Sequence, residues 1–172
     1  SSGVVPGVFV ALQEEYGFSD EEMVTALFNA GAIGYLITRN ATVAGAEGGC
    51  QAEVGAASAM AASAATELLG GTPSQCMSAA ATAITNILGL VCDPIAGLVE
   101  APCQKRNAMG ASNAIVAAQI TLAGVGNLLP LDEVIDVMYT VGKSIPFELR
   151  ETALGGVAAS PTGCALQKRI FG

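Results

Sequence analysis

The chain is 172 residues long, carries 15 acidic against 7 basic residues for a net charge of −8, contains no histidine and is 52% hydrophobic. The acidic balance leaves few side chains that could neutralise phosphates, so neither a nucleic acid nor an anionic membrane surface is an expected partner. The absence of histidine excludes Ser–His–Asp and Cys–His catalytic arrangements and every histidine-bound metal site.

The first half of the chain is expected to be helical almost throughout. The stretch from Pro6 to Gly17 has apolar residues at helical spacing, and proline and glycine suit its start and its end. Ser19 with Glu22 three residues later is a capping box. The glycine-rich stretch 45–49 is expected to be a flexible stop. The helices expected in this half cover residues 6–16, 20–39 and about 51–69.

In the second half of the chain, proline and glycine mark the helix boundaries more clearly. Thr72 and Gln75 form a second capping box, with Pro73 at the first helical position. Two prolines and a glycine break the helix within 93–102. The residues from 155 onward are expected to be a loose tail. The helices expected in this half cover about 72–88, 104–125 and 132–143, with a short one starting at Pro146.

The abundance of small residues shapes the expected fold. Alanine (31) and glycine (21) leave a core of small side chains, so helix backbones are expected to approach closely. Uncharged runs at 68–92 and 107–131 are long enough to span a membrane, but both carry several polar residues and neither has a Trp/Tyr belt. We therefore expect residues 1–172 to form a single all-α domain, a compact bundle of about seven helices. The opening SSGVVPG resembles the interior of a longer protein, so the chain is expected to be a fragment.

The cysteines are the main candidates for functional residues. The chain has five, an odd number with no CxxC pair, which disfavours a disulfide framework and zinc-ribbon or thioredoxin-like sites. Cys76 lies inside a helix and is expected to be a buried structural residue. Cys50 follows two glycines at an expected helix start, where free N–H groups stabilise a thiolate. Cys92 and Cys103 bracket the broken segment 93–102, which allows their sulfurs to come together.

Three thiols without histidine fit an iron–sulfur cluster with one open iron. The alternative is that Cys50, Cys92 and Cys103 are simply small buried hydrophobic residues.

Three stretches of sequence then resemble a known family. EGGCQAEVGAASAMAA, NILGLVCDPIAGLVEAPCQKRNAMGA and the opening SSGVVPG are similar to the α subunit, or α domain, of iron–sulfur-dependent L-serine dehydratase (L-serine ammonia-lyase). The likeness covers nearly the whole chain. It implies an oxygen-sensitive [4Fe–4S] cluster held by Cys50, Cys92 and Cys103, no pyridoxal phosphate, and conversion of L-serine to pyruvate and ammonia. The open iron of the cluster would act as a Lewis acid for the leaving hydroxyl group.

The resemblance also implies a biological setting. It includes a β subunit or domain as partner, an oligomer, a cytoplasmic location, and a role in serine catabolism and gluconeogenesis. Ser1 and Ser2 resemble the end of the family's Gly/Ser-rich substrate loop, so this chain alone is expected to be inactive or nearly so. Two alternatives stay open: a related iron–sulfur hydro-lyase for another hydroxy acid, and a non-catalytic helical scaffold.

The polar run Lys105-Arg106-Asn107, directly after Cys103, is a candidate site for the carboxylate of the substrate. Arginine binds carboxylates with two parallel hydrogen bonds, which suits Arg106 to this role. Its neighbour Asn107 is a candidate for the same site. Lys105 is also a candidate catalytic residue. The alternative is that all three belong to an ordinary charged cluster at a helix start.

Three further residues have competing interpretations. Glu47, three residues before Cys50, is a candidate to contact the substrate, or an ordinary acid near a helix N-terminus. Asp93 is expected to form an Asx turn before Pro94 rather than to act as a base. Cys164 is either a tail ligand of the open iron or a plain surface thiol.

Overall fold

The computed structural model describes residues 1–172, and its eight α-helices confirm the expected all-α fold. One isolated parallel bridge, between Cys92 and Arg150, is its only β-type pairing. The α-helices are α1 (Val4–Tyr16), α2 (Asp20–Asn40), α3 (Gly45–Gly48), α4 (Cys50–Leu68), α5 (Pro73–Thr85), α6 (Cys103–Leu122), α7 (Leu131–Ser144) and α8 (Pro161–Phe171). Three short 3-10 helices are η1 (Ile95–Gly97), η2 (Phe147–Leu149) and η3 (Gly156–Ala159).

Both expected capping boxes start helices. At α2, the Glu22 N–H donates to Ser19 Oγ at 3.3 Å, and the Ser19 N–H donates to Glu22 Oε2 at 2.8 Å. Thr72 and Gln75 make the same pair of bonds at the start of α5, where Pro73 is the first helical residue. These bonds satisfy N–H groups that have no partner within the helix, and so they fix where each helix begins.

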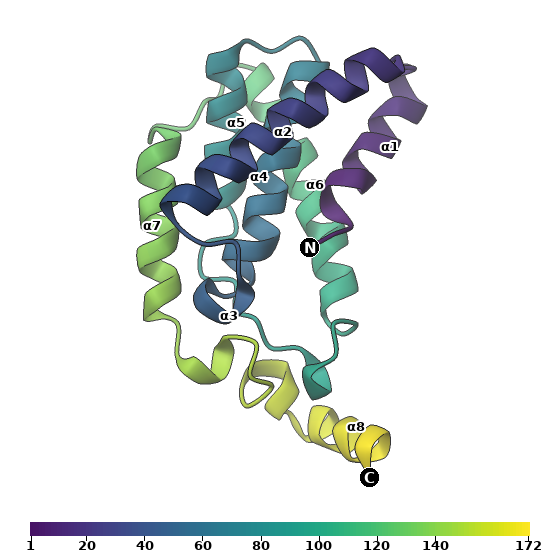
Figure 1. The fold of residues 1–172 in the computed structure, drawn as a ribbon, viewed down its shortest axis with the longest axis vertical. Coiled ribbons are helices and arrows are strands. Elements are labelled where there is room, and N and C mark those ends of the chain that lie inside the picture. The colour runs from purple at the N-terminus through teal and green to yellow at the C-terminus, as the bar shows by residue number, and fades with distance from the viewer.

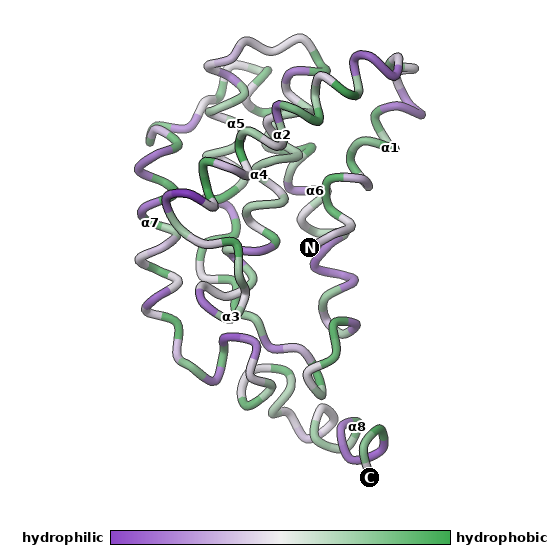
Figure 2. Tube along the Cα trace, in the orientation of Figure 1, coloured by the Kyte–Doolittle hydropathy of each residue, from purple (hydrophilic) through white to green (hydrophobic).

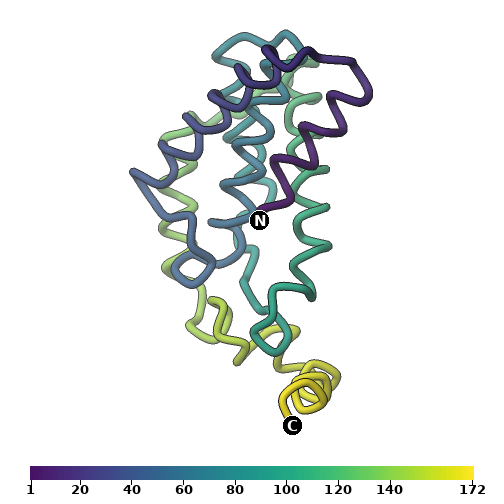
Figure 3. Tube along the Cα trace, turned by 45° about the vertical axis from the view of Figure 1, so that its right-hand side comes forward, coloured from purple at the N-terminus to yellow at the C-terminus, as the bar shows by residue number.

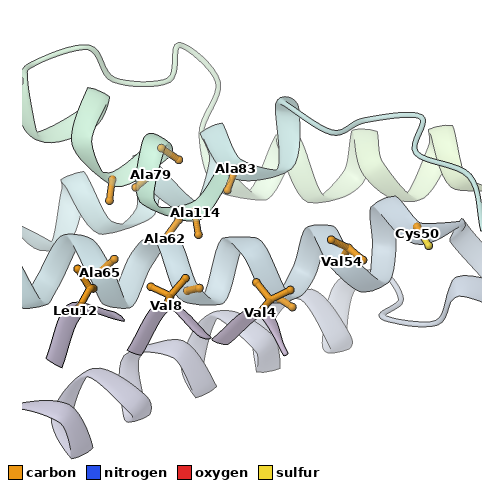
Figure 4. Packing of buried hydrophobic residues seen from close by; sticks show 14 of the residues in the cluster. Val4, Val8, Leu12, Cys50, Val54, Ala62, Ala65, Ala79, Ala83 and Ala114 are labelled. Carbon is orange, nitrogen blue, oxygen red and sulfur yellow. The ribbon is translucent and has the colours of Figure 1, made fainter. Parts of the chain in front are cut away.

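Helix α4 is the centre of the bundle. It packs against α1, α2, α5 and α6 (Figure 1), and 15 of its 19 residues are buried. In the close view of Figure 4, Val4, Val8 and Leu12 of α1 lie against α4, and Cys50 stands at the beginning of α4. A helix that is buried on all sides needs small side chains if its neighbours are to approach, which explains its alanine-rich sequence.

Glycine and small polar residues allow α4 and α6 to approach closely. A Cβ atom on Gly110 of α6 would lie 2.7 Å from Val54 Cγ1 of α4. At the same place, Ser58 Oγ donates to the Gly110 carbonyl and accepts a hydrogen bond from Asn113 Nδ2, each at 2.9 Å. Gly110, which lowers the intrinsic helix propensity of this segment, is therefore required by the packing.

Helix α7 closes one side of the bundle with an amphipathic face. Apolar and polar residues alternate along it (Figure 2), and its apolar side is buried. Gln51, at the start of α4, donates through Nε2 to the Met138 carbonyl at 2.8 Å. The start of α4 is thereby tied to α7.

Two local expectations were wrong. The tail forms helix α8, because Ser160 Oγ accepts the Gly163 N–H at 3.1 Å and Pro161 occupies the first helical position. The stretch 45–49 contains the short helix α3 rather than a flexible stop. The short helix expected at Pro146 is present as the 3-10 helix η2. Figures 1 and 3 both place α8 at one end of the molecule. None of the helices combines the length and apolar character required to cross a membrane.

Candidate functional site

Three separate segments bring Cys50, Cys92 and Cys103 to one cavity. Cys50 is the first residue of α4, Cys103 is the first residue of α6, and Cys92 lies in the extended segment between α5 and η1. All three line a small cavity of about 40 Å³. The rest of its wall consists of Ser1, Glu53, Val54, Pro94, Val99, Arg106, Asn107 and Glu151.

The position of Cys50 at a helix start, expected from sequence, is confirmed. The preceding residue, Gly49, has φ 75°, and a Cβ atom there would lie 2.8 Å from the Leu90 carbonyl oxygen. Only glycine suits this turn, because other residues rarely adopt positive φ and their Cβ would clash with the backbone. The Gln51 N–H donates to the same carbonyl at 2.9 Å. Helices α4 and α6 thus both begin at the cavity, and the dipoles at their N-termini favour negative charge there.

The segment that carries Cys92 is held by backbone hydrogen bonds to a distant part of the chain. The Cys92 N–H donates to the Leu149 carbonyl at 2.8 Å, and the Glu151 N–H donates to the Cys92 carbonyl at 2.7 Å. This pairing brings the Glu151 side chain into the cavity wall. No local pattern indicated this contact, since it depends on where the chain returns after α7.

Arg106 links the Cys50 sulfur to a buried carboxylate. Its Nη1 atom lies 2.7 Å from Asp93 Oδ1, 2.8 Å from the Val91 carbonyl oxygen and 3.8 Å from Cys50 Sγ. The Asp93 side chain is 3% exposed, and its Oδ2 accepts the Val157 N–H at 2.8 Å. The expectation of an Asx turn at Asp93 was therefore wrong: a carboxylate buried this deeply needs a charged partner, and Arg106 provides it.

These contacts favour ionisation of the Cys50 thiol. A hydrogen bond from Cys92 and the charge of Arg106 lower the pKa of Cys50 from 9.0 to about 7, although burial opposes the shift. The pKa of Cys92 is raised, because its thiol is hydrogen-bonded to Cys50 and is buried. Burial also raises the pKa of Cys103. A metal that binds all three sulfurs would therefore displace protons from the latter two.

Two carboxylates that the sequence did not single out lie in the same wall. A Cβ atom on Gly45 would lie 3.0 Å from Glu53 Oε2, 3.1 Å from Cys92 Sγ and 3.4 Å from Glu151 Oε2. Glycine at this position therefore leaves room for three functional groups to converge. Glu53 could have been found, because it follows Cys50 by three residues on a helix and so shares its face.

Asn107 attaches the first residues of the chain to the site. Its Oδ1 accepts the Gly3 N–H at 3.0 Å, and its Nδ2 donates to the Cys103 carbonyl at 2.9 Å. The Ser1 nitrogen in turn lies 3.0 Å from Glu53 Oε1. Ser1, Arg106 and Asn107 thus all line the cavity.

The remaining candidates lie outside the cavity wall. Ser2, Glu47 and Lys105 are exposed. Lys105 follows Cys103 by two residues, and residues two apart on a helix do not share a face. Cys164 is exposed on α8, with its Sγ 3.9 Å from the Ala158 carbonyl oxygen. Cys76 is buried in α5, away from the cavity.

Cys50, Cys92 and Cys103 are the residues of this cavity that could hold a metal cofactor. No three or more Cys, Asp or Glu side chains converge closely enough to hold one metal ion. In a cluster each thiolate binds a different iron, so the thiols surround a space rather than meet at a point. Cys50, Cys92 and Cys103 are free thiols around one cavity, with a guanidinium and two helix N-termini to balance negative charge.

Comparison with known proteins gives a consistent result. A family model described as serine dehydratase alpha chain matches residues 1–158. The probable L-serine dehydratase alpha chain of Bacillus subtilis (strain 168) is 57% identical over 172 residues, which are 100% of this chain and 57% of the relative. That of Latilactobacillus sakei is 50% identical, covering 100% of this chain and 82% of the relative. The L-serine dehydratase alpha chain of Peptoniphilus asaccharolyticus is 52% identical, covering 98% of this chain and 58% of the relative.

Proposed function

Because this chain belongs to the serine dehydratase alpha-chain family, we propose that it is part of an enzyme that converts L-serine to pyruvate and ammonia. The curated relatives are named L-serine dehydratases. The chain spans 57% and 58% of the length of two of them, so the activity is proposed for the whole protein that contains it. The observation that carries the proposal is the convergence of three free thiols on one cavity.

The proposed cofactor is a [4Fe–4S] cluster held by Cys50, Cys92 and Cys103. When bound, such a cluster supplies a Lewis acid for the hydroxyl group that leaves the substrate. The lowered pKa of Cys50 supports its own part in this assignment, because a thiolate is the form that binds iron. Cys92 and Cys103 would release their protons when iron binds. Pyridoxal phosphate has no role in the proposed reaction.

The chain's own residues are proposed to bind and orient the substrate. Arg106 is the only basic side chain in the wall, and its guanidinium is the proposed site for the serine carboxylate. The Arg106 Nη1 atom also lies 3.8 Å from Cys50 Sγ and is held there by its ion pair with Asp93. Arg106 is therefore proposed to position the Cys50 sulfur as well. The carboxylates of Glu53 and Glu151 are suited to the substrate ammonium group, since they are the acidic groups of the wall.

The relatives' names support a partner for this chain. Three of them are called alpha chains, and we propose that this chain also works with a β subunit or domain. A cytoplasmic role in serine catabolism and gluconeogenesis belongs to the same proposal.

Single Cys→Ser variants of the full-length protein, prepared without oxygen, test the ligand assignment. Replacing Cys50, Cys92 or Cys103 should abolish the visible absorbance and most of the iron content. Matched controls are Cys76→Ser, a buried thiol outside the cavity, and Cys164→Ser, an exposed one; both should keep their iron. Full cluster content in any one of the first three variants would contradict the assignment.

Substrate assays then separate the proposed activity from its alternatives. Pyruvate formation from L-serine by the iron-loaded protein supports a serine dehydratase. Turnover of another hydroxy acid without L-serine turnover would indicate a related hydro-lyase. A colourless, iron-free protein after anaerobic reconstitution would favour a helical scaffold.

A further inference from the structure

Helix α2 has a second apolar face that nothing in the chain covers. Its inner face packs against α4 and buries Met23, Ala26, Ala30, Ile33 and Ile37. On the outer face, Phe28 is 77% exposed, Tyr35 68%, Val24 51% and Leu27 49%. No charged residue lies between Glu22 and Arg39. Figure 1 shows α2 crossing the front of the bundle, in front of α4. A contiguous exposed apolar stripe of this kind marks an interaction surface.

The spacing of residues along the stripe allows a second copy of α2 to pack against it. Val24, Phe28, Gly31 and Tyr35 follow one another at intervals of three and four residues, so they lie along one line of the helix. Phe28 protrudes, whereas no atom lies within 4 Å of a Cβ built on Gly31. If two copies of α2 pack antiparallel, each Phe28 meets the Gly31 gap of the other copy, and each Val24 meets Tyr35.

The charges at the two ends of α2 fit the same register. Asp20, Glu21 and Glu22 lie in the first turn, and Arg39 lies in the last turn. In the antiparallel register that pairs Phe28 with Gly31, Asp20 of each copy lies beside Arg39 of the other. The helix dipoles also oppose, so the positive start of one helix lies near the negative end of the other. Contacts that occur twice in this way are characteristic of an interface with twofold symmetry.

We propose that the outer face of α2 is a homodimer interface, formed by two antiparallel copies of α2. The proposal is independent of the enzymatic activity, because none of these residues lines the cysteine cavity. A helix of 21 residues is about 30 Å long, at a rise of about 1.5 Å per residue. One such helix pair is at the small end of specific interfaces, so we expect association through this face to be reversible and concentration-dependent.

Cross-linking in the full-length protein tests the register. In a Cys164→Ser background, the double variant Val24→Cys/Tyr35→Cys is treated with a short bismaleimide under anaerobic conditions. We expect a covalent dimer on a denaturing gel. The control Thr25→Cys/Asn40→Cys carries two exposed cysteines beside the stripe and should remain monomeric on the gel. Equal cross-linking in both variants would overturn the proposal, as would protection of the new cysteines without a dimer band, which would indicate that another segment or protein covers α2.

Charge reversal tests the ion pairs. Asp20→Arg and Arg39→Asp should each lower the dimer yield of the Val24→Cys/Tyr35→Cys protein several-fold, because each places like charges together. The combined reversal should restore the yield, since the opposite charges then face one another again. If the combined variant has a normal circular dichroism spectrum but does not recover the dimer yield, the antiparallel register is refuted.

Discussion

Replacing Arg106 by alanine should destabilise the protein by leaving a buried carboxylate without its counter-charge. Asp93 would keep the Val157 N–H but lose the guanidinium at 2.7 Å, with its side chain only 3% exposed. Removal of one partner from a buried ion pair costs about 3–5 kcal/mol. We expect about 3 kcal/mol, the lower end of that range, because the Arg106 side chain is 16% exposed and water reaches it. For an unfolding unit of 172 residues, the melting temperature should fall by roughly 6–12 °C.

Thermal unfolding of the cluster-free, full-length protein, followed by circular dichroism, measures the loss. Asp93→Asn combined with Arg106→Ala is the matched control, because the amide needs no counter-charge. The double variant should be more stable than Arg106→Ala alone. If Arg106→Ala melts within about 2 °C of the unmodified protein, less than 1 kcal/mol has been lost, and the buried pair is not a determinant of stability.

Three more predictions concern the cavity and the packing. In the cluster-free protein, the thiolate absorbance due to Cys50 should appear as the pH rises through about 7, and Cys50→Ser should remove it. Folding lowers the pKa of Cys50 from 9.0 to about 7, so the ionised thiol stabilises the folded protein. This contribution to the free energy of unfolding is complete above pH 9.0 and is lost as the pH falls through about 7. Urea unfolding at several pH values measures it. Gly45→Ala should lower the iron content but keep the helical circular dichroism spectrum, because its Cβ would lie 3.1 Å from Cys92 Sγ and displace that sulfur. Gly110→Ala should cost about 1–3 kcal/mol in thermal unfolding by overpacking α4 against α6, whereas Gly7→Ala, which meets no atom within 4 Å, should not destabilise.

Some of the fold was available locally in the sequence, including one signal that was missed. The N-cap and proline at Ser160–Pro161 have the same form as Thr72–Pro73, which correctly predicted the start of α5. The neighbouring glycines suggested a loose tail instead, and the helix α8 was not expected. The capping residues were the better guide, because they satisfy specific N–H groups, whereas glycine only lowers the average helix propensity.

The sequence alone determined the helical class, the starts of α2 and α5, and the position of Cys50 at a helix start. The starts of α2 and α5 depend on capping bonds between residues three apart, which the order of residues already specifies. The start at Cys50 was indicated by the two glycines that precede it. Only the tertiary structure decided that Glu151 joins the cavity wall and that Asp93 pairs with Arg106. Asp93 also accepts a hydrogen bond from Val157, a residue 64 positions further along the chain. Contacts over such separations are set by how the helices pack around α4, and no local pattern encodes that arrangement.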